Sequence, residues 1–402
     1  MHSLSILLLS LPFLPGHVLA DTLQSVISAY SLTAASYNFS VPTTTLNSDD
    51  AAQWIVSKWD ATGGKLDFGE NDVVFSPDPA STSATVVRRQ GGVTVPTSAA
   101  SSTASIRASS STSRSTSKSA TGSATSPSST NLSGQPPVLR VEYPQGSYSK
   151  KTGGTQFTSN LTTLAGGSAG GYEKMLLSYD VWFPAGYNFN LGGKLPGLRG
   201  GPDRFGCSGG NQTDGTGCFS TRLMWRQNGA GEVYAYIPST TTLCSQGQTI
   251  CNSDYGVSLG RGQFSFLTGQ WQTIWLLVVL NEVGKSNGLI ELWYNGVQAL
   301  QFPQSALRTS SSITGITGLF FSTFFGGDDT TWASPTQQFS YYRNIQLFAG
   351  SGASTAAGPS TTTSSTGSKG GAGARMGGAG GWTAAAVLGS VGVLAVVGWG
   401  MI

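Results

Sequence analysis

Histidine is almost absent from this chain of 402 residues, which contains only His2 and His17. Both lie in an apolar N-terminal run that ends in a small-residue pattern at Ala20, which is typical of a cleaved secretion signal. A signal peptide is therefore expected over residues 1–20, and the secreted chain is expected to have no histidine. This excludes Ser-His-Asp triads, Cys-His dyads and His-ligated zinc, so acid–base chemistry must use tyrosine, lysine or carboxylates.

Charged residues are also scarce. They make up 10% of the chain, with 22 basic against 19 acidic side chains and a net charge of +3. The basic residues form no run, so the sequence does not favour nucleic acid as a partner. Between Arg140 and Arg226, however, nine Lys or Arg residues stand against five Asp or Glu residues. A cleft in this part of the chain is therefore expected to attract an anionic polymer.

Cysteine occurs only four times, at Cys207, Cys218, Cys244 and Cys251, within 45 residues. Behind a secretion signal, such a cluster predicts disulfides. Four cysteines allow three pairings. We favour the sequence-local one, Cys207 with Cys218 and Cys244 with Cys251, because it pins the loops on either side of a central hairpin. A zinc site is disfavoured because neither C-x-x-C spacing nor histidine accompanies the cysteines.

Large apolar residues are few in two stretches, residues 80–135 and residues 350–381, which consist mainly of Ser, Thr, Gly and Ala. Such segments bury too little surface to offset chain entropy, so the first is predicted to be a disordered, O-glycosylated insertion or linker and the second a stalk. Residues 382–402 are apolar, and no basic residue follows them. This pattern favours a GPI signal, with attachment within residues 370–374, over a membrane span.

We therefore expect a secreted protein that a lipid anchor holds at the cell surface. N-glycosylation sequons, which are typical of secreted surfaces, are present at Asn38, Asn131, Asn160 and Asn211.

Residues 21–79 and 136–349 are expected to form one domain. The first part predicts a helix over residues 49–59, capped by Asp49 or Asp50, and a strand over residues 72–79. About 60 residues make a very small independent core. The strand pattern resumes at residues 138–143, so we expect the insertion to interrupt a single domain between neighbouring strands, which loop-closure entropy permits. A linker between two domains is the alternative.

From residue 138 onward the pattern is all-β. Residues 174–183 alternate between apolar and mixed positions, residues 270–280 form an apolar run, and residues 290–297 end in a hairpin signal. Many short strands with Gly-rich turns predict a two-sheet sandwich of the jelly-roll type.

Residues 192–238 contain the densest polar chemistry. Residues 218–226 alternate, and the alternation resumes at residues 232–237 after a turn, which predicts an antiparallel hairpin. If Arg226 lies opposite Glu232, then Arg222 faces Tyr236. One solvent-facing side of the hairpin then carries Ser220, Arg222, Tyr234 and Tyr236. An ordinary solvated sheet face is the other interpretation of the same pattern.

Three stretches of this region carry a family resemblance. GGKLPGL (192–198), CFSTRLMWR (218–226) and EVYAYIP (232–238) resemble the core of polysaccharide lyase family 14, the alginate and glucuronan lyase group. The similarity includes YPQGSYS (143–149), LSYDVWFP (177–184) and NGLIELWYNG (287–296), and covers most of residues 138–349. The resemblance implies a β-jelly roll that cleaves polyuronates by β-elimination. It also implies active-site roles for Lys194, Ser220, Arg222, Tyr234 and Tyr236.

Elimination at a 4-linked uronate requires a cation for the carboxylate, a base for the C5 proton and an acid for the departing O4. Arg222 suits the first role because its guanidinium matches a carboxylate in a bidentate geometry. Tyr236 suits proton transfer if nearby cations lower its pKa, and Lys194 suits the base or a stabiliser of the enolate-like intermediate. Tyr234 and Ser220 would orient the sugar or share proton transfer. No cofactor or metal is expected.

A non-catalytic, lectin-like surface protein is the alternative from another class, because it would share the fold, the aromatic residues and the secretion signals. Lys194, Arg222 and Tyr236 favour the enzyme, since binding of neutral sugars does not require them. A glycoside hydrolase needs two carboxylates across the cleft, and only Glu232 lies on the candidate face. The expected partner is an anionic polysaccharide substrate, and the protein is expected to be a monomer.

Overall fold

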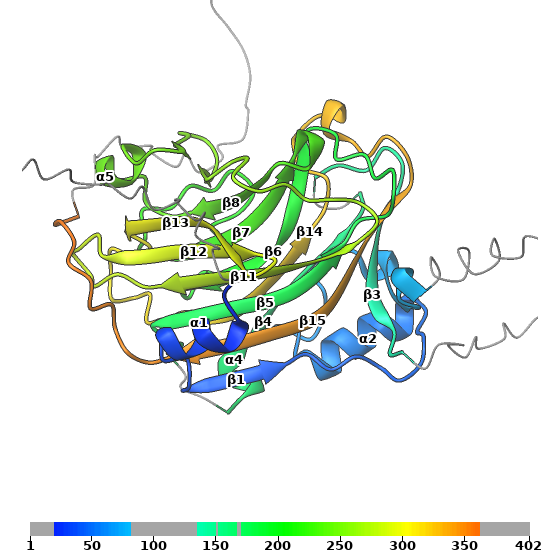
Figure 1. Ribbon diagram of the computed structural model, residues 1–402, viewed down its shortest axis with the longest axis horizontal. Coiled ribbons are helices and arrows are strands. Elements are labelled where there is room, and N and C mark those ends of the chain that lie inside the picture. The colour runs from blue at the N-terminus through cyan, green and yellow to red at the C-terminus, as the bar shows by residue number, and fades with distance from the viewer. Residues whose placement is uncertain (1–19, 82–134, 150–151, 167–169, 362–402) are drawn as a thin grey trace, which may run out of the picture. The chain divides into compact units, whose positions relative to one another are not determined.

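The computed structural model describes residues 20–81, 135–149, 152–166 and 170–361. The expected signal peptide up to residue 19, residues 82–134 of the insertion and the apolar C-terminal tail lie outside the described residues. The described residues form two antiparallel sheets with short helices around them (Figure 1).

The first sheet runs across one layer of the fold. Its strands, in spatial order, are β13 (Val297–Ser305), β12 (Gly288–Tyr294), β11 (Trp271–Val279), β5 (Lys174–Trp182), β15 (Gln338–Gly350), β3 (Val138–Tyr143) and β2 (Val73–Ser76), and β1 (Ala35–Asn38) also pairs with β15.

The second sheet forms the other layer. Its strands, in spatial order, are β4 (Thr155–Asn160), β14 (Ile316–Thr323), β6 (Gly192–Gly200), β7 (Phe219–Arg226), β8 (Gly231–Tyr236), β10 (Val257–Leu259) and β9 (Thr249–Ile250). The remaining elements are α1 (Leu23–Ala29), α2 (Ser48–Lys58), α4 (Leu161–Leu164), α5 (Thr241–Cys244) and the short 3₁₀ turns η1 (Glu70–Asp72), η2 (Gln227–Gly229) and η3 (Thr330–Trp332).

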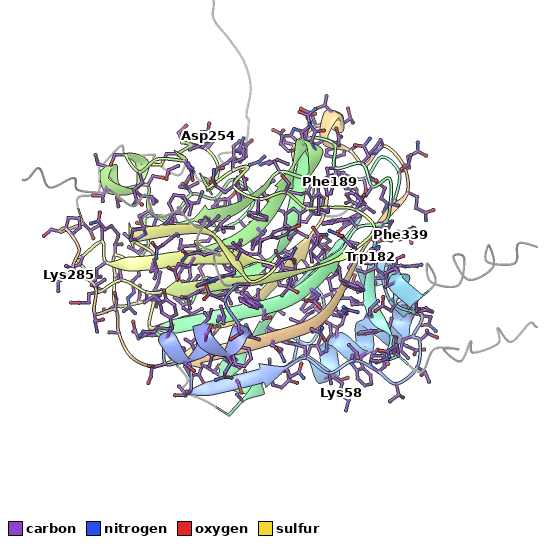
Figure 2. The ribbon with its side chains drawn as sticks, viewed as in Figure 1. Lys58, Trp182, Phe189, Asp254, Lys285 and Phe339 are labelled. Atoms are coloured by element: carbon purple, nitrogen blue, oxygen red, sulfur yellow. A yellow bond between two sulfur atoms is a disulfide. The ribbon has the colours of Figure 1, made fainter. Side chains whose placement is uncertain are left out.

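The core lies between the two sheets, where side chains fill the space densely (Figure 2). Alternate residues of β5, such as Leu177 and Tyr179, belong to the same core as alternate residues of β7, such as Leu223 and Trp225, and all four are fully buried. Alternation of this kind buries one face of each strand and leaves the other face for other contacts. The predicted all-β, two-sheet jelly-roll sandwich is confirmed.

The residues before the insertion contribute directly to the first sheet. β1 pairs with β15, and β2 pairs with β3, so that Val73 lies opposite Val141. Trp59 and Phe75 are each 1% exposed within the main core. The chain therefore leaves the sheet at β2 and re-enters it as the neighbouring strand β3.

The predicted helix over residues 49–59 is present as α2, but its predicted cap is wrong. Asn47 is the N-cap, and its side chain accepts a hydrogen bond from the Asp50 backbone N–H at 3.0 Å. Asp49 and Asp50 instead occupy the first turn, where their charges interact favourably with the positive end of the helix dipole.

The predicted hairpin near residues 290–297 joins β12 to β13. Asn295 and Gly296 form its turn with φ values of 52° and 79°. Two consecutive left-handed residues are what a tight hairpin turn requires, and Asn-Gly adopts them readily.

Candidate active site

The hairpin of β7 and β8 lies at the centre of the second sheet, and its register differs from the predicted one. Ser220 lies opposite Tyr236, and Met224 lies opposite Glu232. The predicted pairing of Arg226 with Glu232 is wrong by two residues, because the turn closes earlier than expected. Its two left-handed residues, Asn228 and Gly229, have φ values of 59° and 80°.

A shift of two residues leaves every side chain on its predicted side, because the pleat repeats every two residues. Leu223, Trp225 and Ala235 point into the main core. The opposite face of the second sheet, hereafter the outer face, carries the polar residues of all three central strands. These are Lys194 of β6, Ser220, Arg222 and Arg226 of β7, and Glu232, Tyr234 and Tyr236 of β8, and the apolar Met224 of β7 lies among them.

The outer face is covered rather than open to solvent as predicted. Arg222 and Glu232 are fully buried, and Lys194 is 9% exposed. Two loops from other parts of the chain reach the face. The backbone N–H of Gly210 donates to the Tyr236 hydroxyl at 2.9 Å, and that of Gly256 donates to the Tyr234 hydroxyl at 3.1 Å. The prediction of a solvated face is wrong because the alternation within a hairpin carries no information about distant loops.

Lys194 is a buried lysine of the outer face. Its Nζ lies 2.8 Å from the Met224 sulfur and 3.5 Å from the centroid of the Tyr234 ring. Burial, and after it the positive charges of Arg222 and Arg226, lower the pKa of the Lys194 amine well below its ordinary value of 10.5. The lowered pKa favours the neutral amine, which is the form that can accept a proton.

The two tyrosines have their hydroxyl groups fixed by backbone donors. Burial, and after it the adjacent Tyr236, raises the pKa of the Tyr234 phenol, so this group is neutral at physiological pH. The Tyr236 hydroxyl accepts from the Gly210 backbone, a bond that does not use its own proton. Their rings meet edge to face, with centroids 5.6 Å apart.

Ser220 and Arg222 lie on the same face but are enclosed by the protein. The Ser220 hydroxyl donates to the Cys207 carbonyl at 2.7 Å, and Arg222 Nη1 donates to the Ser322 hydroxyl at 3.1 Å. Arg222 Nε and Nη2 have no hydrogen-bond partner among the described residues. Burial lowers the pKa of Arg222 to about 10, so it remains a cation at neutral pH. Direct contact of Arg222 with a substrate carboxylate stays a prediction, which this enclosed position does not favour.

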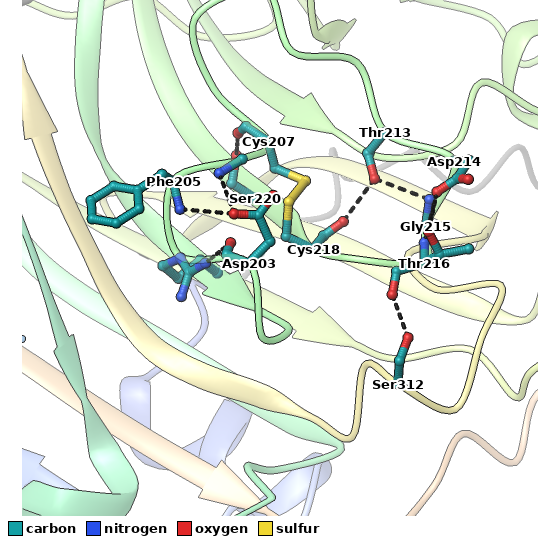
Figure 3. Close-up of a disulfide and its surroundings, with 12 residues drawn as sticks. Asp203, Phe205, Cys207, Thr213, Asp214, Gly215, Thr216, Cys218, Ser220 and Ser312 are labelled. Carbon is teal, nitrogen blue, oxygen red and sulfur yellow. Dashed lines mark hydrogen bonds between the residues drawn. A yellow bond between two sulfur atoms is a disulfide. The ribbon is translucent and has the colours of Figure 1, made fainter. Parts of the chain in front are cut away.

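Both disulfides form with the predicted, sequence-local pairing. Cys207 bonds to Cys218, and Cys244 bonds to Cys251. Figure 3 shows the first of them beside Ser220, with the Asp203 side chain accepting from the backbone of Phe205 and Gly206 in the same loop. This disulfide ties the loop that contacts Tyr236 and Ser220 to the start of β7.

The structure adds three residues to the site that sequence patterns did not single out for it, namely Arg226, Arg261 and Trp332. Glu232 accepts from Arg226 Nε at 2.8 Å and from Arg261 Nε at 2.7 Å. The guanidinium of Arg226 lies 5.7 Å from the Tyr234 ring centroid and 6.0 Å from that of Trp332. Arg261 and Trp332 come from loops beyond the hairpin, and no short motif marks either position.

A pocket of about 450 Å³ opens on the outer face. Of the five residues predicted for the site, its lining includes Lys194, Tyr234 and Tyr236 but not Ser220 or Arg222. The other side chains that give the pocket its character are Met224, Arg226, Ile250, Tyr255, Arg261, Phe324, Asp328 and Trp332. Aromatic walls with cations at one end suit an anionic sugar chain.

Among the described residues, no group of three or more His, Cys, Asp or Glu side chains is placed to hold a metal ion. The helices that the structure describes include none that is long and apolar enough to span a membrane. Of the predicted glycosylation sites, Asn38 and Asn211 are exposed, Asn160 is partly buried, and Asn131 lies outside the described residues. Their glycosylation stays a prediction.

The fold and the site define a two-sheet β-sandwich protein with a pocket of lysine, arginine, tyrosine and tryptophan on one sheet. The chain belongs to a particular family within this class. The family model described as Polysaccharide lyase 14 matches residues 131–345, which is more than half of the chain. The family resemblance seen in the sequence is thereby confirmed.

Several proteins are similar to this chain. The marine alginate lyase of Aplysia kurodai is 37% identical over 55% of this chain and 85% of its own, with a TM-score of 0.49. An alginate lyase from Chlorella virus is 24% identical over 55% of this chain and 88% of its own, with a TM-score of 0.44. Exolysin of Paramecium bursaria Chlorella virus 1 is 29% identical over 184 residues, which are 39% of this chain and 26% of exolysin. This chain thus spans about a quarter of the length of that relative.

Proposed function

We propose that this protein is a polysaccharide lyase that cleaves a 4-linked polyuronate by β-elimination. The observation that carries the proposal is that Lys194 and Tyr236 line the same pocket. The Lys194 amine is buried there, and its pKa is lowered. Family membership supports the reaction class, and the alginate lyases among the similar proteins make alginate a first candidate substrate beside glucuronan.

The proposed reaction needs one base and one acid. The neutral Lys194 amine takes the C5 proton of the uronate, and the electron pair of the C5–H bond forms the new double bond between C4 and C5. The C4–O4 bond breaks, and the Tyr236 hydroxyl protonates O4. Tyr234, held neutral by burial, orients the sugar, and Arg222, which does not line the pocket, helps to keep Lys194 unprotonated.

The test is incubation of the purified protein with alginates rich in mannuronate, alginates rich in guluronate, and glucuronan. Elimination creates unsaturated uronate ends that absorb in the ultraviolet, whereas hydrolysis does not. We expect absorbance to rise with at least one polymer. Saturable binding of all three polymers without any absorbing product would show a lectin-like protein instead.

We also propose that the protein is secreted and held at the cell surface by a lipid anchor. The two disulfides agree with an oxidising compartment, and the apolar tail in the sequence has the composition of a GPI signal. Phosphatidylinositol-specific phospholipase C should release the protein from intact cells. Retention after treatment, with the C-terminal peptide still detected by mass spectrometry, would contradict this proposal.

A further inference from the structure

Glu232 is a fully buried carboxylate that holds two arginines at one end of the pocket. Its Oε1 accepts from Arg226 Nε at 2.8 Å and lies 2.6 Å from Arg226 Nη2 in an ion pair, and its Oε2 accepts from Arg261 Nε at 2.7 Å and from the Ser258 hydroxyl at 2.5 Å. Burial alone would raise the pKa of Glu232, but the two arginines and Ser258 outweigh it and keep the pKa below its ordinary value. Glu232 is therefore ionised at neutral pH and is not a proton donor for hydrolysis.

The two arginines keep guanidinium donors that do not bond to Glu232. Arg226 retains Nη1, and Arg261 retains Nη1 and Nη2, without a hydrogen-bond partner among the described residues. Two guanidinium charges against the one carboxylate of Glu232 leave this cluster with one net positive charge. Both arginines line the pocket together with Lys194.

The two arginines differ in how firmly they are held. The side chain of Arg226 is 15% exposed and lies against the rings of Tyr234 and Trp332, whereas that of Arg261 is 41% exposed and reaches the pocket from beyond β10. Glu232 fixes the guanidinium of each through Nε, so the outward Nη groups are oriented before any ligand arrives. Preorganised donors lose little entropy on binding.

We propose that Arg226 and Arg261 form the carboxylate-binding subsite of the pocket, with Glu232 as the residue that positions them. This inference rests on the proposed function, and it names the cations of this chain that bind the carboxylate of the uronate. Arg222 is fully buried and does not line the pocket, whereas Arg226 and Arg261 do. A guanidinium fork matches a planar carboxylate in two parallel hydrogen bonds, and Trp332 beside Arg226 offers an apolar wall for the sugar ring.

The subsite is tested with Arg261→Ala, because the exposed position of Arg261 lets it be removed without opening the core. Lys285→Ala is the matched control, since Lys285, labelled in Figure 2, also forms an exposed ion pair, with Glu282, and lies outside the pocket lining. The ligands are a glucuronan oligosaccharide and the same oligosaccharide with its carboxylates reduced to alcohols. Binding is measured by calorimetry with Lys194→Ala as the background, so that no turnover occurs.

We expect Arg261→Ala to weaken binding of the acidic oligosaccharide by about 10- to 100-fold, the usual effect of losing a charged hydrogen-bond donor. Binding of the reduced oligosaccharide should change little, and Lys285→Ala should change neither. Arg261→Lys should recover only part of the loss, because an ammonium lacks the planar fork. Glu232→Gln should also weaken acidic binding, since the arginines lose their anchor.

Equal affinity of Arg261→Ala and its parent for the acidic oligosaccharide would overturn the subsite. An equal loss of affinity for the acidic and the reduced oligosaccharide would also overturn it, because a carboxylate subsite must discriminate between these two ligands. These outcomes are independent of catalysis. If the protein with Lys194 intact forms no unsaturated product but Arg261→Ala still loses acidic binding, the proposed function fails and the subsite stands.

Discussion

The Lys194 Nζ lies 3.5 Å from the centroid of the Tyr234 ring, although the two residues belong to strands that are not neighbours. β7 runs between them, and its Met224 contributes the sulfur 2.8 Å from the same nitrogen. The aromatic face and the thioether give the amine a weakly polar environment. In such surroundings the charged form loses hydration, and the neutral form that can accept a proton is favoured.

The pH dependence of the reaction should follow this environment. The rate should rise with pH along a limb whose midpoint lies below 10.5, the ordinary pKa of lysine. Arg222 contributes to the lowered pKa through its positive charge, so Arg222→Gln should move the limb to higher pH. Arg204→Gln, which removes a cation paired with Asp67, should leave the limb in place. Initial rates across pH, with circular dichroism to confirm folding, check this prediction.

The lowered pKa of Lys194 also has a consequence for stability. Because the unfolded state binds this proton more tightly, the folded state gains stability as pH rises from the lowered pKa to 10.5. At neutral pH the buried lysine therefore destabilises the fold, and Lys194→Met should raise the free energy of unfolding. The advantage of the Met variant should shrink as pH approaches 10.5. Urea unfolding at several pH values measures this, and a constant difference would contradict the lowered pKa.

The Cys207–Cys218 disulfide should matter for catalysis as well as for stability. It closes the loop that supplies the Gly210 N–H to Tyr236. Replacing both cysteines with serine should cost about 2–4 kcal/mol of unfolding free energy and should lower kcat, because the Tyr236 hydroxyl loses its fixed donor. The second bridge is the control, since no described contact ties its cysteines to Tyr236 or Ser220. Its double serine variant should retain more of kcat at a temperature where both variants are folded.

The residues before the insertion should be needed for folding, whereas residues 82–134 should not. Trp59 is 1% exposed in the main core, so Trp59→Ala should cost about 3–5 kcal/mol of stability. Replacing residues 82–134 with a short Gly/Ser linker should leave the melting temperature nearly unchanged, since β2 and β3 are already neighbours in the sheet. If residues 136–349 alone fold with full activity, the one-domain interpretation is wrong.

The alternation of residues along β7 and β8 was enough to predict which side chains share a face, because the parity of a strand depends only on its own sequence. The register was not predictable to the residue. It depends on Asn228 and Gly229 both adopting left-handed conformations, which shortens the turn. The cap of α2 shows the same limit, since Asn47 and the two aspartates after it are all good N-cap residues.

The burial of the face and the role of Arg261 depend on contacts between distant parts of the chain. Gly256 reaches Tyr234, and Arg261 reaches Glu232, only after the intervening residues have folded back along β8 as β10. No periodicity within the hairpin encodes these contacts. The family motifs located Lys194 in sequence, but its lowered pKa arises from the cations and rings that tertiary structure gathers around it.

The most direct test of the account is chemical rescue of Lys194→Ala. The purified variant is assayed on the preferred polyuronate by the ultraviolet absorbance of unsaturated ends, with and without small primary amines. We predict that Lys194→Ala loses about 10²- to 10⁴-fold in kcat, as loss of a general base does. Added amines should restore part of the rate, increasingly so as their neutral fraction rises with pH. A Lys194→Ala variant with a rate close to that of the unmodified protein would contradict the assignment of Lys194 as the base.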